Sequence, residues 1–177
     1  SQTGLLVLRA CGLPRFNYVC RALPPRLTAD GARLFDAGVL RCFQSLCGIE
    51  QEWWAAHPVA TERVGMGKGR GVGLRRYEDA RFAAFLSAAA MSASFISKEL
   101  LAQRAGKRDS LPEGKSMSFV EDVHDACVAI GRKVVTCSAD EERRKRASDL
   151  LAAVAPALSN VFAIAGVGAF EKVLEGR

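Results

Sequence analysis

Long apolar stripes with the spacing of an α-helix recur along this chain of 177 residues and leave few folds open. The longest runs from Phe82 to Leu100 and is rich in alanine, and shorter ones cover 35–46, 119–134 and 151–162. A stripe of this period is buried by packing against other helices. Aromatic residues, at 7%, are too few to favour a β-sandwich. The sequence therefore predicts an all-α fold, an irregular bundle of about six helices around a long Ala-rich central helix.

Capping and turn residues predict where the helices begin and end. Ser118 and Ser138 each precede a glutamate by three residues, the spacing of a capping box at a helix start. Thr28 is a further candidate N-cap, and Gly48 is a natural helix stop. The segment 5–11 fits either a helix or a strand. The predicted helices run over 15–23, from 28 to 48, over 77–103, from 118, from 138 to 166, and over 169–175.

The cysteines and the predicted central helix indicate the compartment. Within that helix uncharged residues extend only over Phe82–Ser97, 16 residues with four serines, whereas a transmembrane helix needs about 20 strongly apolar residues. We therefore expect a soluble chain with no membrane partner. The six cysteines include no C-x-x-C pair, and four of them lie in apolar helical patterns. Reduced thiols of this kind predict an intracellular location. The N-terminal segment lacks the basic region of a signal peptide and is expected to be a domain boundary.

The net charge of +6 belongs entirely to the first half of the chain. Residues 1–77 hold 11 Lys and Arg against 5 Asp and Glu, whereas residues 78–177 hold 14 of each sign. We expect one helical domain over 1–177, with a basic half and a charge-balanced half. A one-sided excess of positive charge suits a polyanionic partner. A genome-wide preference for arginine codons explains the excess equally well.

The densest basic segment runs from 63 to 76 and contains no acid after Glu62. Its glycines predict a loop. Contacts with a phosphate backbone need only charge and reach, which such a loop supplies. A solvated loop is the alternative. The predicted nucleic-acid contacts are Arg63, Lys68, Arg70, Arg75 and Arg76, together with Arg15 nearer the N-terminus.

Other patterns in the chain lack the context that chemistry requires. The glycine spacing over 65–73 follows no buried strand, so no dinucleotide site is predicted. His124 and Cys127 are three residues apart, but zinc needs more ligands than the sequence offers there. No serine, histidine and acid stand in a suggestive arrangement. The sequence therefore predicts no catalytic residue, no metal, no cofactor and no small-molecule substrate.

Two adjacent tryptophans support a second interpretation. Trp53 and Trp54 are expected to be exposed apolar residues of the kind that protein interfaces use. In this alternative the chain is a helical scaffold for protein–protein interaction with no nucleic-acid role.

Two stretches of the chain match a pattern known from a protein family. The first, 8–18, reads Leu-Arg-Ala-Cys-Gly-Leu-Pro-Arg-Phe-Asn-Tyr and continues through Arg21, Pro24-Pro25 and Phe35-Asp36. The second, 70–75, reads Arg-Gly-Val-Gly-Leu-Arg and precedes the Ala-rich helix with Phe85-Leu86-Ser87. Together they span roughly residues 5–95. They resemble the region after the polymerase block in retroelement reverse transcriptases of the non-LTR type.

The resemblance implies a helical thumb or connector, which helps to grip the template–primer duplex. It predicts a non-catalytic module that binds the backbone of RNA or an RNA–DNA duplex with little sequence preference. Polymerisation itself needs metal-binding aspartates on a hairpin and a further strand. The string Tyr77-Glu78-Asp79 supplies one matching acid at a predicted helix start. We expect no activity from this chain alone, which on this view is part of, or derived from, an RNA-directed DNA polymerase.

Overall fold

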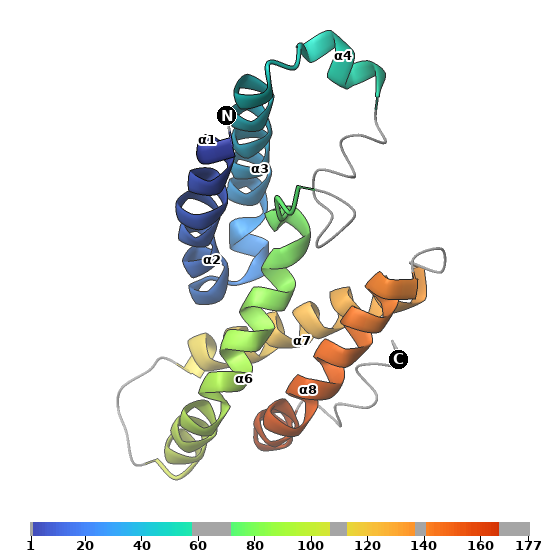
Figure 1. Ribbon diagram of the computed structural model, residues 1–177. Helices are drawn as coiled ribbons and strands as arrows, with labels where there is room; N and C mark the ends of the chain where they lie inside the picture. Colours follow the sequence, from blue (N-terminus) through green and yellow to red (C-terminus); the bar gives the residue numbers. More distant parts are fainter. Residues whose placement is uncertain (1, 58–71, 107–112, 137–140, 167–177) are drawn as a thin grey trace. The chain divides into compact units, whose positions relative to one another are not determined.

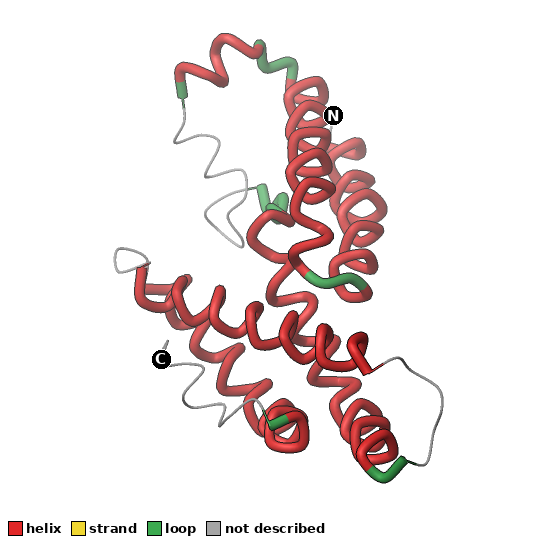
Figure 2. The backbone as a smooth tube through the Cα atoms, turned by 180° about the vertical axis from the view of Figure 1, so that it is seen from behind, coloured by secondary structure: helices red, strands yellow, loops and turns green. Residues whose placement is uncertain are grey.

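The computed structural model describes residues 2–57, 72–106, 113–136 and 141–166. All regular structure in these ranges is helical, as the tube in Figure 2 shows, so the predicted all-α bundle is confirmed. Five helices in these ranges have ten or more residues, and the longest is the Ala-rich α6, of 28 residues. The elements are α1 (Gln2–Val7), the π-helix η1 (Leu8–Gly12), α2 (Leu13–Ala22), α3 (Pro25–Cys47), α4 (Gln51–Ala56), α6 (Tyr77–Arg104), α7 (Glu113–Thr136) and α8 (Glu141–Ala165).

The chain divides into two compact units, which we call unit 1 and unit 2. Unit 1 comprises residues 1–20 and 27–81, and unit 2 comprises residues 21–26 and 82–177. The boundary falls inside α6, whose first turn belongs to unit 1. The prediction of one domain over 1–177 stays a prediction.

Unit 1 is built on the side-by-side packing of α1, η1 and α2 against α3 (Figure 1). Gly4 allows α1 to approach α3 closely, because a Cβ at that position would clash with the side chain of Leu46. Phe16 of α2 stacks on Phe35 of α3 with ring centroids 4.7 Å apart. Buried apolar side chains on both helices complete this contact, among them Leu13, Cys20, Val39 and Phe43.

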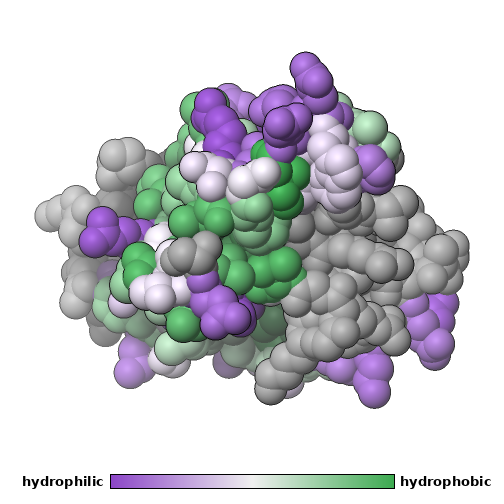
Figure 3. All heavy atoms as spheres, turned by 45° about the horizontal axis from the view of Figure 1, so that its top comes forward, coloured by the Kyte–Doolittle hydropathy of each residue, from purple (hydrophilic) through white to green (hydrophobic). Residues whose placement is uncertain are grey.

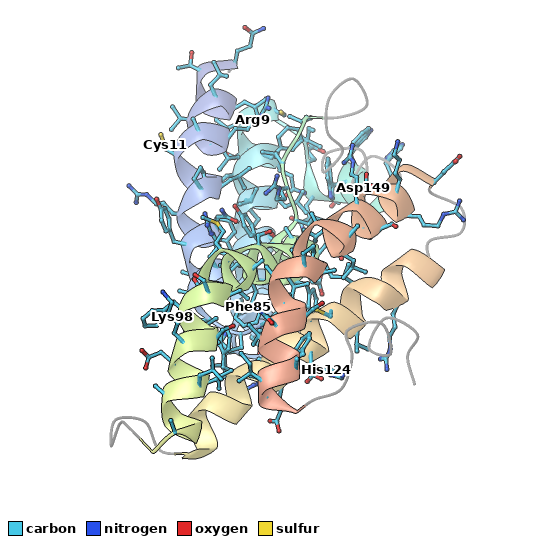
Figure 4. All side chains as sticks on the ribbon, turned by 90° about the horizontal axis from the view of Figure 1, so that it is seen from below. Arg9, Cys11, Phe85, Lys98, His124 and Asp149 are labelled. Carbon is cyan, nitrogen blue, oxygen red and sulfur yellow. The ribbon has the colours of Figure 1, made fainter. Side chains whose placement is uncertain are left out.

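Unit 2 encloses one continuous apolar cluster between α6, α7 and α8. Its largest fully buried side chains are Phe85 and Phe162, and Figure 4 shows Phe85 among the side chains between the helices. An ion pair joins the start of α3 to α7, where Arg26 Nε donates to Asp122 Oδ1 at 2.6 Å. The carboxylate of Asp122 raises the pKa of Arg26. Two spans, Tyr77–Ala102 within α6 and Arg144–Ala165 within α8, are long and apolar enough to cross a membrane by length and composition. Both helices contribute to this cluster.

The predicted helix ends are partly right. The helix at 77–103 and the stop at Gly48, which has φ +65°, are confirmed. Thr28 is not an N-cap: α3 begins at Pro25, whose missing N–H costs nothing in the first turn, and Thr28 is buried inside the helix. The capping box at Ser118 is also wrong, because α7 begins at Glu113 and the Ser118 hydroxyl instead accepts a bond from Arg26 Nη2 at 3.4 Å.

Three further predictions have other outcomes. The segment 5–11 is helical, as α1 and η1. Ser138 and the closing helix at 169–175 lie outside the described residues. Of the loop predicted over 63–76 the structure describes 72–76, which have no regular structure, and the short helix α4 lies before it.

Candidate nucleic-acid interface

The start of α6 is held by a carboxylate from the middle of α3. The first amides of an α-helix have no partner within the helix. Asp36 supplies both oxygens: Tyr77 N–H donates to Oδ1 and Glu78 N–H donates to Oδ2, each at 2.8 Å. Negative charge at this end also complements the helix dipole. Asp36 therefore holds the first turn of α6, and residues 72–76 before it, on α3.

Tyr77 forms a second link at the same place. Its hydroxyl donates to the carbonyl oxygen of Leu13, at the start of α2. Its ring lies edge-on to both Phe16 and Phe35, with centroids 5.4 Å apart in each pair. The ring is 2% exposed, and burial raises the pKa of Tyr77. Tyr77, two residues after the stretch 70–75, thus contacts both parts of the first stretch: Leu13 and Phe16 in 8–18, and Phe35-Asp36. All of these residues belong to unit 1.

Gly73 brings an arginine to the base of the basic segment. Its φ of +74° is one that glycine adopts readily. A Cβ at Gly73 would lie 3.3 Å from Nη2 and 3.5 Å from Cζ of Arg9, so the guanidinium lies directly on the glycine backbone. Arg9, labelled in Figure 4, belongs to the π-helix η1 and is exposed. Gly73 therefore places Arg9 beside the segment that carries Arg75.

Nothing in the sequence pairs Arg9 with Gly73 or Asp36 with Tyr77. Arg9 is 64 residues from Gly73, and Asp36 is 41 residues from Tyr77. Leu8-Arg9 and Phe35-Asp36 belong to the stretches that carry the resemblance, but the resemblance does not indicate which residues they contact. Both contacts depend on the tertiary packing of α2 and α3.

The structure describes three of the six residues predicted to contact phosphate. Arg15, Arg75 and Arg76 are exposed in unit 1, while Arg63, Lys68 and Arg70 lie outside the described residues. Arg76 Nη2 donates to Glu78 Oε2 at 2.9 Å. Its charge is therefore already shared with a carboxylate.

Four exposed arginines of unit 1 make no ion pair with an acid in the part of the chain that the structure describes: Arg9, Arg15, Arg41 and Arg75. Arg33 differs, because it contacts Asp30 at 3.2 Å and Glu78 at 3.5 Å. A guanidinium with no carboxylate partner retains its donors for a bidentate contact with phosphate. We call Arg9, Arg15, Arg41 and Arg75 the open arginines.

The two tryptophans have different surroundings. Trp54 is 8% exposed and packs edge-on against Phe43, with ring centroids 6.1 Å apart. Trp53 is 47% exposed and stacks on His57 at 4.2 Å. With Gly48, Ile49 and Glu50 it lines a shallow hollow. Of the two rings only Trp53 is therefore accessible to a partner. Figure 3 shows hydrophobic residues gathered on the face in view, with hydrophilic residues around them.

The described residues include five of the six cysteines. All five are free, as predicted, and Cys137 lies outside the described range. Burial raises the pKa of Cys20 to about 11 and that of Cys127 to about 12, so neither thiol is activated as a nucleophile. No group of three or more His, Cys, Asp or Glu side chains in this part of the chain could hold a metal ion.

No protein-family model matches the chain, and no curated protein or solved structure matches it. The argument for function accordingly rests on the charges and contacts of unit 1.

Proposed function

We propose that unit 1 binds the phosphate backbone of RNA or an RNA–DNA duplex with little sequence preference. The observation that carries the proposal is the set of four open arginines, exposed and without an acid partner among the described residues. Two of them lie near Gly73: the guanidinium of Arg9 contacts its backbone, and Arg75 follows it by two residues. Guanidinium groups held by packed helices bind phosphate with less loss of side-chain entropy than mobile ones.

The expected mode of binding follows from the kind of donor involved. Arginine contacts to phosphate set position and affinity but carry no sequence information. Each neutralised phosphate of a duplex releases counterions and contributes about −0.9 to the slope of log K against log salt. Four such contacts give a slope of roughly −3 to −4. Binding should therefore weaken steeply between low and physiological salt.

The resemblance to retroelement reverse transcriptases supports the same proposal from another direction. Residues of its two stretches contact each other through Leu13, Phe16, Asp36 and Tyr77. A helical module from the thumb or connector of such a polymerase would need this contact to hold the basic segment in place. We therefore propose that origin for the chain, with no catalytic role assigned to it.

The test is a titration of a labelled RNA–DNA duplex, followed by fluorescence anisotropy at low salt. The variant Arg9→Gln/Arg15→Gln/Arg75→Gln should lose on the order of 10- to 100-fold in affinity and lower the salt slope by about 3. The matched control is Arg144→Gln/Lys145→Gln/Arg146→Gln, three exposed cations of α8 in unit 2. Glu141 and Asp149 stand three or four residues from these cations, the spacing of side-chain pairs on a helix, and Arg146 has an interaction of its own. The control is therefore expected to bind almost as the wild type does.

Two results contradict the proposal. Equal losses in the two triple variants would mean nonspecific attraction between a polyanion and any cationic surface. A wild-type chain that does not bind the duplex or the single-stranded RNA at low salt would also overturn it. Circular dichroism of each variant should first establish that the helices are intact.

A second candidate function is protein docking through Trp53. The observation in its favour is the half-exposed Trp53 ring beside a shallow hollow. In this case Trp53→Ala would abolish binding of a protein partner and leave the duplex affinity unchanged. A loss of duplex affinity in Trp53→Ala would assign the ring to nucleic acid instead.

A further inference from the structure

Helix α6 is apolar on two opposite faces, only one of which is covered. Phe85, Ala89, Ala93 and Leu100 lie in the unit 2 cluster. On the opposite side, Met91 is 75% exposed and Phe95 is 65% exposed. A helix that is apolar all round is normally covered all round. The outer face of α6 is therefore the kind of surface that another element covers.

The exposed residues lie close together on the helix. Met91, Phe95 and Lys98 stand at positions i, i+4 and i+7, which lie on one side of an α-helix. Leu101, 53% exposed, is three residues beyond Lys98 and borders this side. In Figure 4 Lys98 projects from the outer side of α6, away from Phe85. We call Met91, Phe95, Lys98 and Leu101 the α6 stripe.

The charge along this stripe is positive. Arg21, also in unit 2, donates from Nη2 to the sulfur of Met91 at 3.2 Å, and Lys98 is exposed one turn beyond Phe95. The neighbouring acids are engaged elsewhere: Asp122 binds Arg26, and the partly buried Glu99 has an interaction of its own. A partner that covers the stripe must therefore supply carboxylates as well as apolar side chains.

We infer that the α6 stripe is the docking surface for an amphipathic helix of another protein, with apolar residues on one face flanked by Asp or Glu. Aromatic residues, methionine and arginine are the types enriched at the centres of protein interfaces. The exposed Ser92 and Ser94 flank the stripe and leave room for a second helix axis at about 8–10 Å. The inference concerns unit 2 and is independent of the proposed function of unit 1.

Other occupants fit the stripe less well. A second copy of the chain would bring the cations Arg21 and Lys98 to the same interface, where like charges repel. Single-stranded nucleic acid binds through successive aromatic rings, and Phe95 is the single aromatic ring of the stripe. A helix with carboxylates satisfies both the apolar surface and the two cations.

The test uses two labelled 18-residue helical peptides with the same leucine stripe, one flanked by glutamate and its twin flanked by lysine. Fluorescence anisotropy with the full 177-residue chain should show at least tenfold tighter binding of the glutamate peptide. Met91→Ser/Phe95→Ser should lose at least tenfold in affinity for that peptide. Lys98→Glu should remove or reverse the preference between the twins. Leu27→Ser/Leu34→Ser, a control with similar exposure on α3 (59% and 72%), should keep the wild-type affinity.

Several outcomes would overturn the inference. Equal affinity of the wild type for both peptides, or no affinity for either, removes the acidic helix as the occupant. If Met91→Ser/Phe95→Ser instead lowers the affinity for single-stranded RNA or for anionic vesicles, the stripe faces nucleic acid or lipid. The Arg9→Gln/Arg15→Gln/Arg75→Gln variant should bind the peptide normally, which separates this result from the outcome for unit 1.

Discussion

The two units of this chain are stabilised in different ways. Unit 2 depends on a continuous apolar cluster between three long helices, with Phe85 and Phe162 at its centre. Unit 1 has a smaller apolar contact and depends on specific polar bonds, from Asp36 to two amides and from Tyr77 to a carbonyl. Unit 1 also carries the open arginines, whereas Arg26 of unit 2 is paired with Asp122. The two units thus differ in the interactions that hold their helices together, and the open arginines belong to the unit that depends more on polar bonds.

The largest predicted effect is a cavity in unit 2. Phe162→Ala removes a ring that is 0% exposed and should lower the free energy of unfolding by about 3–5 kcal/mol. Phe95→Ala, an equal truncation of a ring that is 65% exposed, should cost less than about 1 kcal/mol. Urea denaturation followed by circular dichroism measures both. Similar losses in the two variants would mean that the cluster is not the source of stability.

Removal of the cap on α6 should have the next largest effect. Asp36→Ala leaves the amides of Tyr77 and Glu78 without their acceptor and should cost about 2 kcal/mol. Asp30→Ala, at an exposed position on the same helix, should cost less than about 0.5 kcal/mol. In the Asp36 variant, amide hydrogen exchange should accelerate at residues 77 and 78 and remain unchanged in α7. Faster exchange throughout α7 would show that the two units do not differ in this way.

Alkaline pH should destabilise both units through their buried thiols. Burial raises the pKa of Cys20 to about 11 and of Cys127 to about 12 in the folded chain. Above pH 9 the unfolded chain loses these protons first, so stability is full below that pH and falls as pH rises toward the folded values. At pH 10 each thiol should account for about 1.4 kcal/mol. The loss should stop near pH 11 for Cys20 and near pH 12 for Cys127.

The measurement is the difference in unfolding free energy between pH 7 and pH 10, for the wild type, Cys20→Ala and Cys127→Ala. Each substitution changes the stability at both pH values, but only the pH-dependent part reports the thiol. Each variant should lose about half of the wild-type difference. A difference that neither substitution changes would place the alkaline sensitivity in other groups.

The sequence predicted best those parts of the fold that depend on local periodicity. The stripe from Phe82 to Leu100 lies on α6, and Gly48 ends α3 with a positive φ. These features follow from the helical repeat and from the conformational freedom of glycine. The capping signals at Thr28 and Ser118 failed, because Pro25 starts α3 earlier and Ser118 lies inside α7, where it contacts Arg26. A local signal is weak where tertiary contacts compete with it.

The candidate site was predictable only in its composition. The sequence identified Arg15, Arg75 and Arg76 as cations in a basic half, and the structure describes all three as exposed. It could not predict that Glu78 partners Arg76, or that Gly73 receives Arg9. Arg9 and Gly73 are 64 residues apart and meet only through the packing of unit 1, whereas Arg76 and Glu78 are two residues apart, and the sequence alone does not give the direction of their side chains. Binding of nucleic acid and the retroelement origin remain predictions.

The smallest predicted effect concerns Glu78, an acid of unit 1 that pairs with two of its arginines. Its carboxylate contacts Arg76 at 2.9 Å and Arg33 at 3.5 Å. Glu78→Gln releases Arg76 and removes one of the two acid partners of Arg33, which keeps Asp30. Duplex affinity at low salt should therefore rise by about two- to threefold if unit 1 binds phosphate. The variant should lose less than about 1 kcal/mol of stability, since exposed ion pairs and first-turn acids each contribute little.

Glu52→Gln is the matched control, because Glu52 is also an exposed acid in the first turn of a helix and has no ion pair with an arginine among the described residues. Both variants change the net charge of the chain by the same amount. A general reduction of repulsion would therefore raise the affinity equally in the two. A rise confined to Glu78→Gln would show that Arg76 joins the open arginines once its carboxylate partner is removed. Equal rises in duplex affinity in the two variants would mean that only the net charge of the chain affects binding. The pairing of individual arginines with acids would then play no role.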